Sequence, residues 1–109
     1  MKYDSVKIAL AIRKAVQAAA VFENDDDGGT CNFDCAYICV PGMREAQAKE
    51  IEALAGVRLS LSTYRWHGRI LQIVGGRSGQ GMRQTKMAEA MKNSLVADGF
   101  DASVYYQMD

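Results

Sequence analysis

The fold is decided by residues 57–74, which read VRLSLSTYRWHGRILQIV. Apolar Val57, Leu59 and Leu61 alternate with polar residues, and this period of two is typical of a half-buried strand. Residues 69–74 form a second run in which strand-forming side chains dominate. A glycine lies between the two runs, so this stretch predicts a β-hairpin.

The length of the hairpin loop decides which residues face each other. A two-residue turn at His67-Gly68 places polar Ser62 beside apolar Ile73 and mixes the two faces. We expect instead a three-residue loop, Trp66-His67-Gly68, with Gly68 in the left-handed conformation of a bulge. This register predicts that Leu59 lies beside Ile73, Leu61 beside Leu71, and Ser62 beside Gln72.

The segments outside the hairpin alternate between helical and extended patterns. We expect helices over residues 4–22, 43–55 and 81–98, and further strands over residues 33–40 and 102–108. After the first helix, the order β-α-β-β-α-β predicts an α+β fold with a ferredoxin-like antiparallel sheet, strand order 4-1-3-2, and both later helices on one face. The amphipathic N-terminal helix is then left to cover the other face or to join a partner.

The length and composition fit one domain. The chain has 109 residues, which we divide into an N-terminal helix (1–22), an acidic loop (23–32) and a βαββαβ core (33–109). Hydrophobic residues make up 49% and charged residues 24%, the balance of a soluble globular protein. No apolar run approaches the roughly 18 residues that span a bilayer. Three cysteines without a secretory context indicate reduced thiols, so we expect a cytoplasmic protein with no membrane partner.

The charges are unevenly spread although the formal net charge is zero. Residues 57–93 carry seven cations and one anion, whereas residues 23–52 carry eight anions and two cations. A zero net charge gives no global field that attracts nucleic acid or a membrane. Because closed symmetry lets a surface meet its own counterpart, one alternative is a homo-oligomer in which the acidic surface meets the basic one.

A glycine-rich stretch, GGRSGQG at residues 75–81, stands between the hairpin and the last helix. The N-terminus of a helix carries partial positive charge and binds anions, so acidic residues are usual in its first turn. Here the first acid is Glu89, and basic residues precede it. This pattern predicts an anion or partner site. The residues that we expect to form it are Gly76, Arg77, Ser78, Gly79, Gly81, Arg83 and Lys86, with Arg58 adding to the same basic surface.

Several anions fit such a loop: a nucleic-acid phosphate, a cofactor pyrophosphate, or carboxylates of a partner protein. Alternatively, the arginines are solvated, or the anion is internal. The predicted sheet places the loop at the same end as aspartates 25–27. These aspartates either neutralise the basic loop or are displaced by a partner.

One region is similar to the pyrophosphate-binding region of the GNAT acetyltransferases. It runs from Leu71 through Gly79-Gln80-Gly81-Met82 and the last helix to Gly99-Phe100-Asp101-Ala102. The family motif is Gln or Arg, two residues, Gly, one residue, and Gly or Ala; here Ser78 holds its first place and Arg83 its last. The resemblance implies an acyl-CoA-dependent transferase that binds the cofactor at this loop.

The cysteine spacing Cys31-x3-Cys35-x3-Cys39 is a candidate metal site, because thiolates bind zinc. Residues eight apart in a strand are separated by roughly 26 Å, so the outer two thiols cannot share an ion. We therefore predict free cysteines and no metal. No nucleophile stands near a recognisable base in the sequence, so we predict neither catalytic residues nor a cofactor.

Tyrosines form a further candidate surface. Tyr37, Tyr105 and, in one register, Tyr64 share the sheet face away from the two later helices. Aromatic side chains on such a face stack bases in RRM domains, although residues 69–74 lack the aromatic side chain that the family has there. If the N-terminal helix covers this face, the tyrosines become core.

These patterns together favour a small binding or accessory module that recognises a protein or a nucleic acid through the basic loop and does not act as a catalyst. A small, simple domain of this kind suits an accessory or inhibitor protein of a phage or mobile element. The alternatives are the acyl-CoA-dependent transferase and the homo-oligomeric assembly protein.

Overall fold

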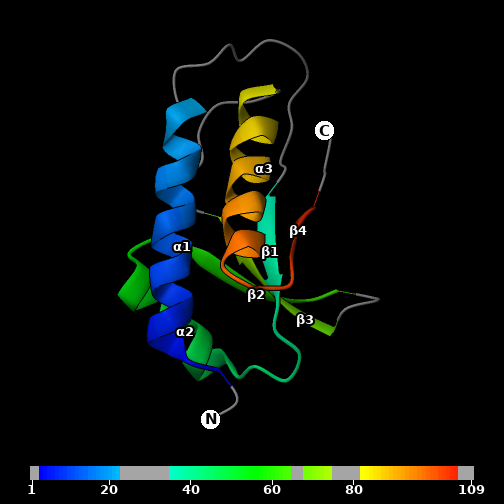
Figure 1. Ribbon diagram of the computed structural model, residues 1–109. Helices are drawn as coiled ribbons and strands as arrows, with labels where there is room; N and C mark the ends of the chain where they lie inside the picture. The colour runs from blue at the N-terminus through cyan, green and yellow to red at the C-terminus, as the bar shows by residue number, and fades with distance from the viewer. Residues whose placement is uncertain (1–2, 23–34, 65–67, 75–81, 106–109) are drawn as a thin grey trace.

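The computed structural model describes residues 3–22, 35–64, 68–74 and 82–105, with the backbone alone for residues 22 and 82–85 (Figure 1). Within these ranges the chain forms an α+β fold, in which three α-helices accompany a four-stranded antiparallel sheet. Its elements in chain order are α1 (Ser5–Ala19), the 3₁₀ turn η1 (Ala20–Phe22), β1 (Cys35–Cys39), α2 (Glu45–Ala55), β2 (Leu59–Tyr64), β3 (Gly68–Ile73), α3 (Met82–Ala97) and β4 (Ala102–Tyr105).

The strands lie in the order β2-β3-β1-β4, and each neighbouring pair is antiparallel. Counted from the β4 edge, the order is 4-1-3-2. In Figure 1, β2 and β3 run across the view while β1 and β4 run along it, so the sheet is strongly twisted. Strong twist brings opposite corners of one face closer together.

The hairpin register follows the predicted pairing of its apolar residues. Leu59 lies opposite Ile73 and Leu61 opposite Leu71. Ser62, however, lies opposite Ile70, because Tyr64 pairs with Gly68 and this fixes every pair before it. The expected neighbour of Ser62 is still in reach: its hydroxyl donates to Gln72 Oε1, 3.3 Å away on the diagonal.

The hairpin loop itself, residues 65–67, lies outside the described residues. Gly68 directly after it has φ +71°, the left-handed conformation that we expected.

The helix ends carry the capping chemistry that the sequence favours. The Asp4 carboxylate accepts a hydrogen bond from the Lys7 N–H at 3.1 Å and caps the start of α1. At the end of α3, the Phe100 N–H donates to the Leu95 carbonyl at 3.1 Å, beside Gly99 with φ +91°. This is the Schellman geometry expected for Gly99-Phe100.

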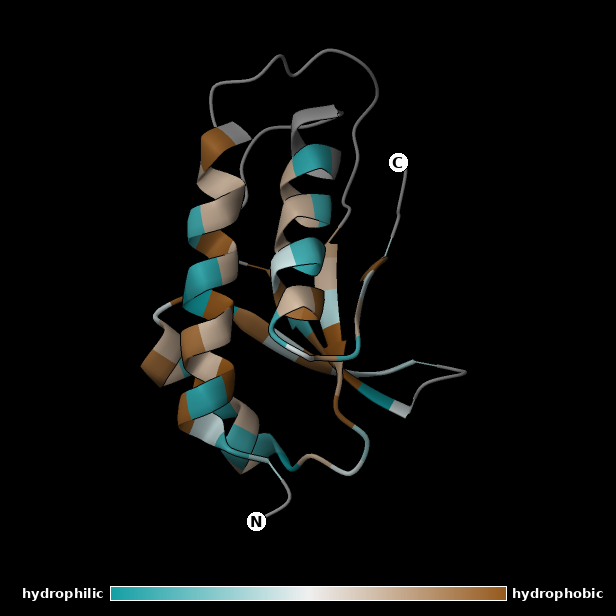
Figure 2. Ribbon diagram, viewed as in Figure 1, coloured by the Kyte–Doolittle hydropathy of each residue, from teal (hydrophilic) through white to brown (hydrophobic). Residues whose placement is uncertain are grey.

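The main core lies between one face of the sheet and all three helices. Along β1 and β3, the buried residues of this core alternate with residues outside it, as the period of a strand requires. Hydrophilic and hydrophobic residues also alternate along α1 (Figure 2). Its large, almost completely buried side chains include Ile12 from α1, Ile51 from α2, Met91 and Leu95 from α3, and Ile38, Leu71 and Ile73 from the sheet.

The position of α1 corrects an expectation. The helix neither covers the far face of the sheet nor remains free for a partner, because it packs against α2 and α3 on the helical side (Figure 1). Polar contacts hold its start in place. Gln47 Nε2 donates to the Tyr3 carbonyl at 2.8 Å and to Ser5 Oγ at 3.0 Å, and the Tyr3 hydroxyl donates to the Pro41 carbonyl at 2.6 Å.

The strand expected over residues 33–40 is observed as Cys35–Cys39, and the one expected over 102–108 as Ala102–Tyr105. The acidic loop, residues 23–32, lies outside the described residues. Across the ranges that the structure covers, no helix has the length and hydrophobicity needed to span a bilayer.

Candidate functional site

The glycine-rich loop connects two elements that the structure does describe. β3 ends at Ile73 and α3 begins at Met82, with no acidic residue in its first turn. Lys86 on α3 is exposed. The remaining predicted contact residues fall outside the described part: Gly76, Arg77, Ser78, Gly79 and Gly81 entirely, and Arg83 in its side chain.

Arg58 lies beside the point where the loop begins. The Val74 N–H donates to the Arg58 carbonyl at 2.9 Å, which continues the β2–β3 ladder by one pair. Side chains alternate along a strand, so Arg58 lies on the same side of the sheet as Ser60. Arg58 is exposed, and it therefore places a cation at the end of the sheet from which the glycine-rich loop departs.

The sheet face opposite the helices carries polar and aromatic side chains. We call it the open face, because the helices all pack on the other side. Strand alternation and the observed register define its members. They are Cys35, Tyr37 and Cys39 from β1, Ser60, Ser62 and Tyr64 from β2, Ile70 and Gln72 from β3, and Ser103 and Tyr105 from β4.

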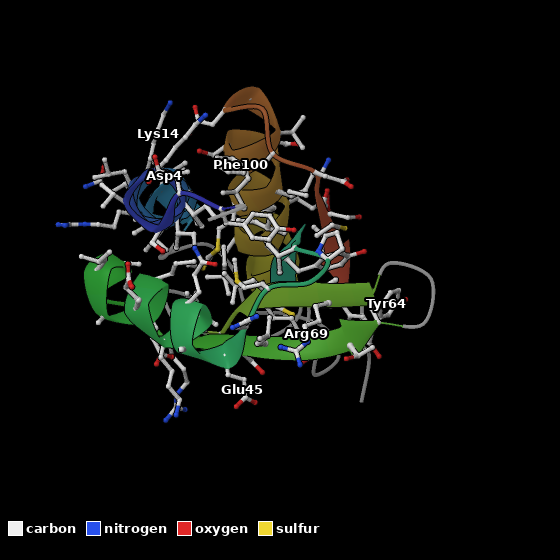
Figure 3. The ribbon with its side chains drawn as sticks, turned by 90° about the horizontal axis from the view of Figure 1, so that it is seen from below. Asp4, Lys14, Glu45, Tyr64, Arg69 and Phe100 are labelled. Carbon is white, nitrogen blue, oxygen red and sulfur yellow. The ribbon has the colours of Figure 1, made fainter. Side chains whose placement is uncertain are left out.

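Three tyrosines meet on the open face, two of which, Tyr37 and Tyr105, the sequence places there, while it leaves the position of Tyr64 open. The ring centroids of Tyr37 and Tyr64 are 6.0 Å apart, and those of Tyr64 and Tyr105 are 5.8 Å apart in an edge-to-face arrangement. Tyr64 and Tyr105 come from the two edge strands, so the twist of the sheet is what brings their rings together. Figure 3 shows Tyr64 at the hairpin, far from α1. We call these residues the tyrosine cluster.

The members of the cluster differ in exposure. Tyr37 is 4% exposed, whereas Tyr64 and Tyr105 are half-buried. Burial raises the pKa of the Tyr37 phenol, and a hydrogen bond with Ser103 offsets part of this rise. Tyr37 is therefore a neutral phenol at physiological pH. The cluster therefore has one buried ring and two half-buried rings.

The cysteines of β1 do not provide a reactive thiol. Cys35 is buried, Cys39 is half-buried, and both are free of disulfides. Burial raises the pKa of the Cys39 thiol, and the neighbouring Asp101 carboxylate raises it further by its charge and its hydrogen bond. Because the thiolate is the nucleophilic form, Cys39 is a poor nucleophile at neutral pH. Cys31 lies outside the described residues.

Arg69, which the sequence places among the cations of the hairpin, has a structural contact. Its Nη1 donates to the Met43 carbonyl at 2.6 Å, and its own carbonyl accepts from the Val40 N–H at 2.8 Å. These bonds hold the connection between β1 and α2 against the start of β3. Nothing in the local sequence around Arg69 indicates this contact, because its partners are distant along the chain.

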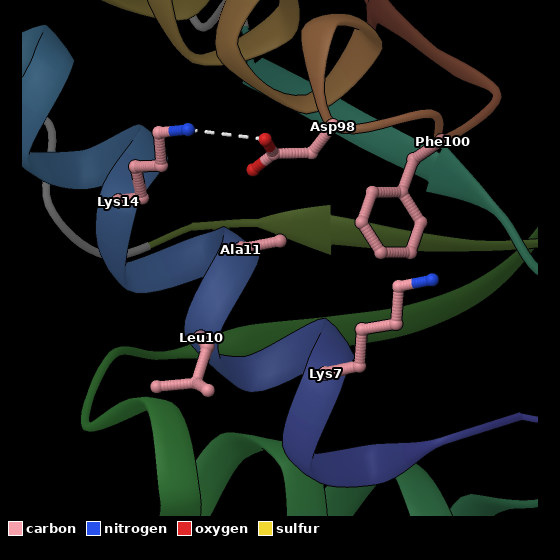
Figure 4. A pocket seen from close by; sticks show the side chains of 6 residues that line it. All are labelled: Lys7, Leu10, Ala11, Lys14, Asp98 and Phe100. Carbon is pink, nitrogen blue, oxygen red and sulfur yellow. Dashed lines mark hydrogen bonds and ion pairs between the residues drawn. The ribbon is translucent and has the colours of Figure 1, made fainter.

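A shallow groove lies on the helical side, between α1 and the end of α3 (Figure 4). Its volume is about 260 Å³. Lys14 Nζ lies 3.1 Å from Asp98 Oδ1 at one side, and 60% of Leu10 is exposed. The groove was not predicted; the Schellman motif at Gly99-Phe100 is the sequence signal nearest to it. Its lining residues are Lys7, Leu10, Ala11, Lys14, Asp98 and Phe100.

The structure thus brings together the tyrosine cluster and places Arg58 at the loop end of the same face. In the described ranges, no group of three histidine, cysteine, aspartate or glutamate side chains is arranged to hold a metal ion. The predicted pyrophosphate motif lies mainly in residues 75–81, so the acetyltransferase resemblance stays a prediction. Comparison of the chain with protein-family models, with curated proteins and with solved structures finds no match.

Proposed function

We propose that this chain is a ferredoxin-like binding module that holds single-stranded nucleic acid on its open face. The observation that carries the proposal is the tyrosine cluster, with two half-buried rings whose centroids lie 5.8 Å apart on the face of the sheet opposite the helices. Nucleic-acid bases stack on aromatic side chains, and this stacking does not depend on the base sequence because every base has a flat ring face.

The polar residues around the rings suit contact with bases. Ser60, Ser62 and Gln72 are half-buried and Ser103 is exposed, so hydroxyl and amide groups border the tyrosines. Such groups donate and accept hydrogen bonds with the edges of unpaired bases. A single strand, unlike a duplex, offers both an open ring face for stacking and free base edges.

The phosphates are expected at the loop end of the open face. Arg58 is exposed there, and Tyr105 pairs with Cys35 at the same end of the sheet. The predicted cations of the glycine-rich loop and of α3, Arg77, Arg83 and Lys86, follow directly in the sequence. Cations at this end neutralise the backbone while the bases reach the rings. The basic loop and the tyrosine face then serve one ligand.

The test is fluorescence anisotropy of labelled oligo(dT) and oligo(rU), titrated with protein at low and at physiological salt. Tyr64→Ala removes a stacking ring and is expected to weaken binding roughly tenfold, since a stacked base contributes about 1–3 kcal/mol. Tyr64→Phe keeps the ring and serves as the matched control, with affinity close to that of the unaltered protein. Circular dichroism and a melting curve check that each variant folds.

A second arm uses Arg58→Ala, which is expected to remove one phosphate contact. The slope of log affinity against log salt concentration should then become less steep by about 1. Absence of binding to either oligonucleotide at low salt overturns the proposal. So does binding that Tyr64→Ala leaves unchanged. If the protein captures a protein partner and no oligonucleotide, the alternative class of partner is correct.

A further inference from the structure

The edge strand β2 has a backbone that is available for pairing. It lies at one margin of the sheet and bonds to β3 on its inner side alone. Its sequence, Leu59 to Tyr64, contains neither charge nor proline, two of the devices that natural edge strands use to prevent pairing with another chain. The opposite edge, β4, is shorter over its described residues.

The direction of the outer backbone groups follows from the hydrogen bond at the start of the hairpin. The Val74 N–H donates to the Arg58 carbonyl, so this pair is hydrogen-bonded within the sheet. Hydrogen-bonded pairs alternate along an antiparallel ladder. Ser60, Ser62 and Tyr64 therefore bond inward to β3, while Leu59, Leu61 and Thr63 direct their N–H and C=O groups outward.

One outward group already has a partner. The Leu59 N–H donates to Glu52 Oε2 of α2 at 2.8 Å, which agrees with the outward direction derived from the ladder. This contact removes Leu59 from the set of donors that a new strand can use. Leu61 and Thr63 remain as the outward pairing residues of the described edge.

A groove runs beside this edge, between α2 and β2, with a volume of about 360 Å³. Half-buried Leu59 and Leu61 lie in it together with Ala48, and charged residues of both signs border it, including Glu45 and Lys49. Figure 3 shows Glu45 on α2 at the side of the molecule where β2 and β3 lie. A strand added to β2 would place every second side chain in this groove.

We propose that β2 is the contact surface for a second copy of this chain, which pairs with it antiparallel about a two-fold axis through Ser62. In this register Leu61 of each copy exchanges backbone hydrogen bonds with Thr63 of the other, and the Leu59–Glu52 contact stays intact. An axis through Leu61 would require Leu59 to leave Glu52. The carboxylate of Glu52 thus excludes the Leu61 register, and the axis through Ser62 pairs both outward residues of the described edge, Leu61 and Thr63.

The chemistry of the edge favours a second copy over an unrelated strand. The outward residues complement themselves under the two-fold axis, as an isologous interface requires. The groove beside the edge is bordered by Lys49 and by Glu45 and Glu52, so the two copies bring charges of both signs to the paired edges. A chain with zero formal net charge does not repel its own copy.

The first test measures the oligomeric state by sedimentation equilibrium over a wide range of protein concentration. The unaltered protein is expected to form a dimer. Thr63→Pro removes an outward N–H without touching the inner ladder and is expected to raise the dimer dissociation constant roughly tenfold or more. Two controls, Thr63→Ala and Ala102→Pro, keep the dimer, because one retains the N–H and the other alters the opposite edge.

The second test fixes the register and does not depend on a proline variant folding. With Ser62→Cys, mild oxidation is expected to link the two copies through the introduced thiols, because residues directly opposite each other bring their Cβ atoms within disulfide range. Ser60→Cys is the matched control. The two copies of residue 60 are roughly 13 Å apart along the strand in this register and should not link.

A monomer at every concentration overturns the proposal. A dimer that Thr63→Pro leaves intact shows that β2 is not the contact surface. A dimer that links through Ser60→Cys and not through Ser62→Cys shows that the two-fold axis does not pass through Ser62. Recruitment of a strand from another protein by a monomeric chain overturns the choice of a second copy. Mass spectrometry of the linked peptides separates these outcomes from linkage through the native cysteines.

Discussion

Both faces of the sheet carry large buried side chains, but only those on the helical side belong to the main core. On the helical side, Ile38, Leu71 and Ile73 are almost completely buried beneath three helices. On the open face, Tyr37 and Ile70 are equally buried, yet they lie outside that core. The main core therefore lies on the helical face, and the recognition role that we propose falls to the rings and polar groups of the open face.

The largest difference between the faces is expected in stability. Ile38→Ala leaves a cavity beneath the helices and should lower the free energy of unfolding by about 2–5 kcal/mol. Ser103→Ala, at an exposed position of the open face, should change it by less than about 0.5 kcal/mol. Urea denaturation followed by circular dichroism measures both. Equal losses for the two variants would contradict the division into a structural and a recognition face.

The tyrosine cluster should fall between these limits. Tyr64→Ala removes two ring contacts at a half-buried position, and such contacts contribute about 0.5–1.5 kcal/mol beyond the area that they bury. The expected loss of stability is therefore smaller than for Ile38→Ala, and Tyr64→Phe should retain most of it. A loss as large as that of Ile38→Ala would place Tyr64 in the core rather than on a binding face.

Much of the local structure could be predicted from the sequence because its causes lie within a few residues. Gly99-Phe100 ends α3 as expected, since the required bond joins Phe100 to Leu95 in the preceding turn. The apolar alternation of Leu59 and Leu61 likewise placed them opposite Ile73 and Leu71. The pairing of Ser62 was wrong, because Tyr64 pairs with Gly68 and the loop is therefore placed one residue earlier than expected, which alternation alone does not determine.

The side on which α1 packs could not be predicted, because its causes are distant in sequence. The apolar stripe of α1 fits either face of a sheet. The start of α1 is held by hydrogen bonds from Tyr3 to Pro41, which is 38 positions away in the chain, and from Gln47, which is 44 positions away, to Tyr3. The structural contact of Arg69 with Met43 is similarly remote, 26 positions along the chain, and the sequence does not indicate it. Strand alternation alone placed Tyr37 and Tyr105 on one face, whereas the place of Tyr64 depends on the hairpin register.

The open face also contains a thiol whose reactivity can be tuned. Burial and the Asp101 carboxylate both raise the pKa of Cys39, so its alkylation by iodoacetamide should be slow at neutral pH and should accelerate as pH rises. Asp101→Asn removes the negative charge and lowers this pKa, which should speed alkylation at a fixed pH. Site-resolved mass spectrometry distinguishes Cys39 from the other cysteines. A slower reaction in the variant would show that the carboxylate does not act on the thiol.

The smallest effect is expected on the outer surface of the helical layer. Lys14 and Asp98 form an ion pair at 3.1 Å, but 65% of the lysine side chain is exposed. Exposed pairs contribute about 0–1 kcal/mol because water and salt screen them. Lys14→Met should therefore shift the urea midpoint slightly, and high salt should abolish the difference. A loss above this range would mean that the groove beside Phe100 depends on the pair.

The central claim is that the open face, and not the helical layer, meets the ligand. The most direct measurement is a ¹H–¹⁵N NMR titration of the labelled protein with short single-stranded oligonucleotides. We predict that amide shifts concentrate at Ser60, Ser62, Gln72 and Ser103, with Arg58 at the loop end, and that α1 and α2 change little. Shifts confined to the helices, or none at saturating oligonucleotide, would contradict the assignment of the open face as a nucleic-acid surface.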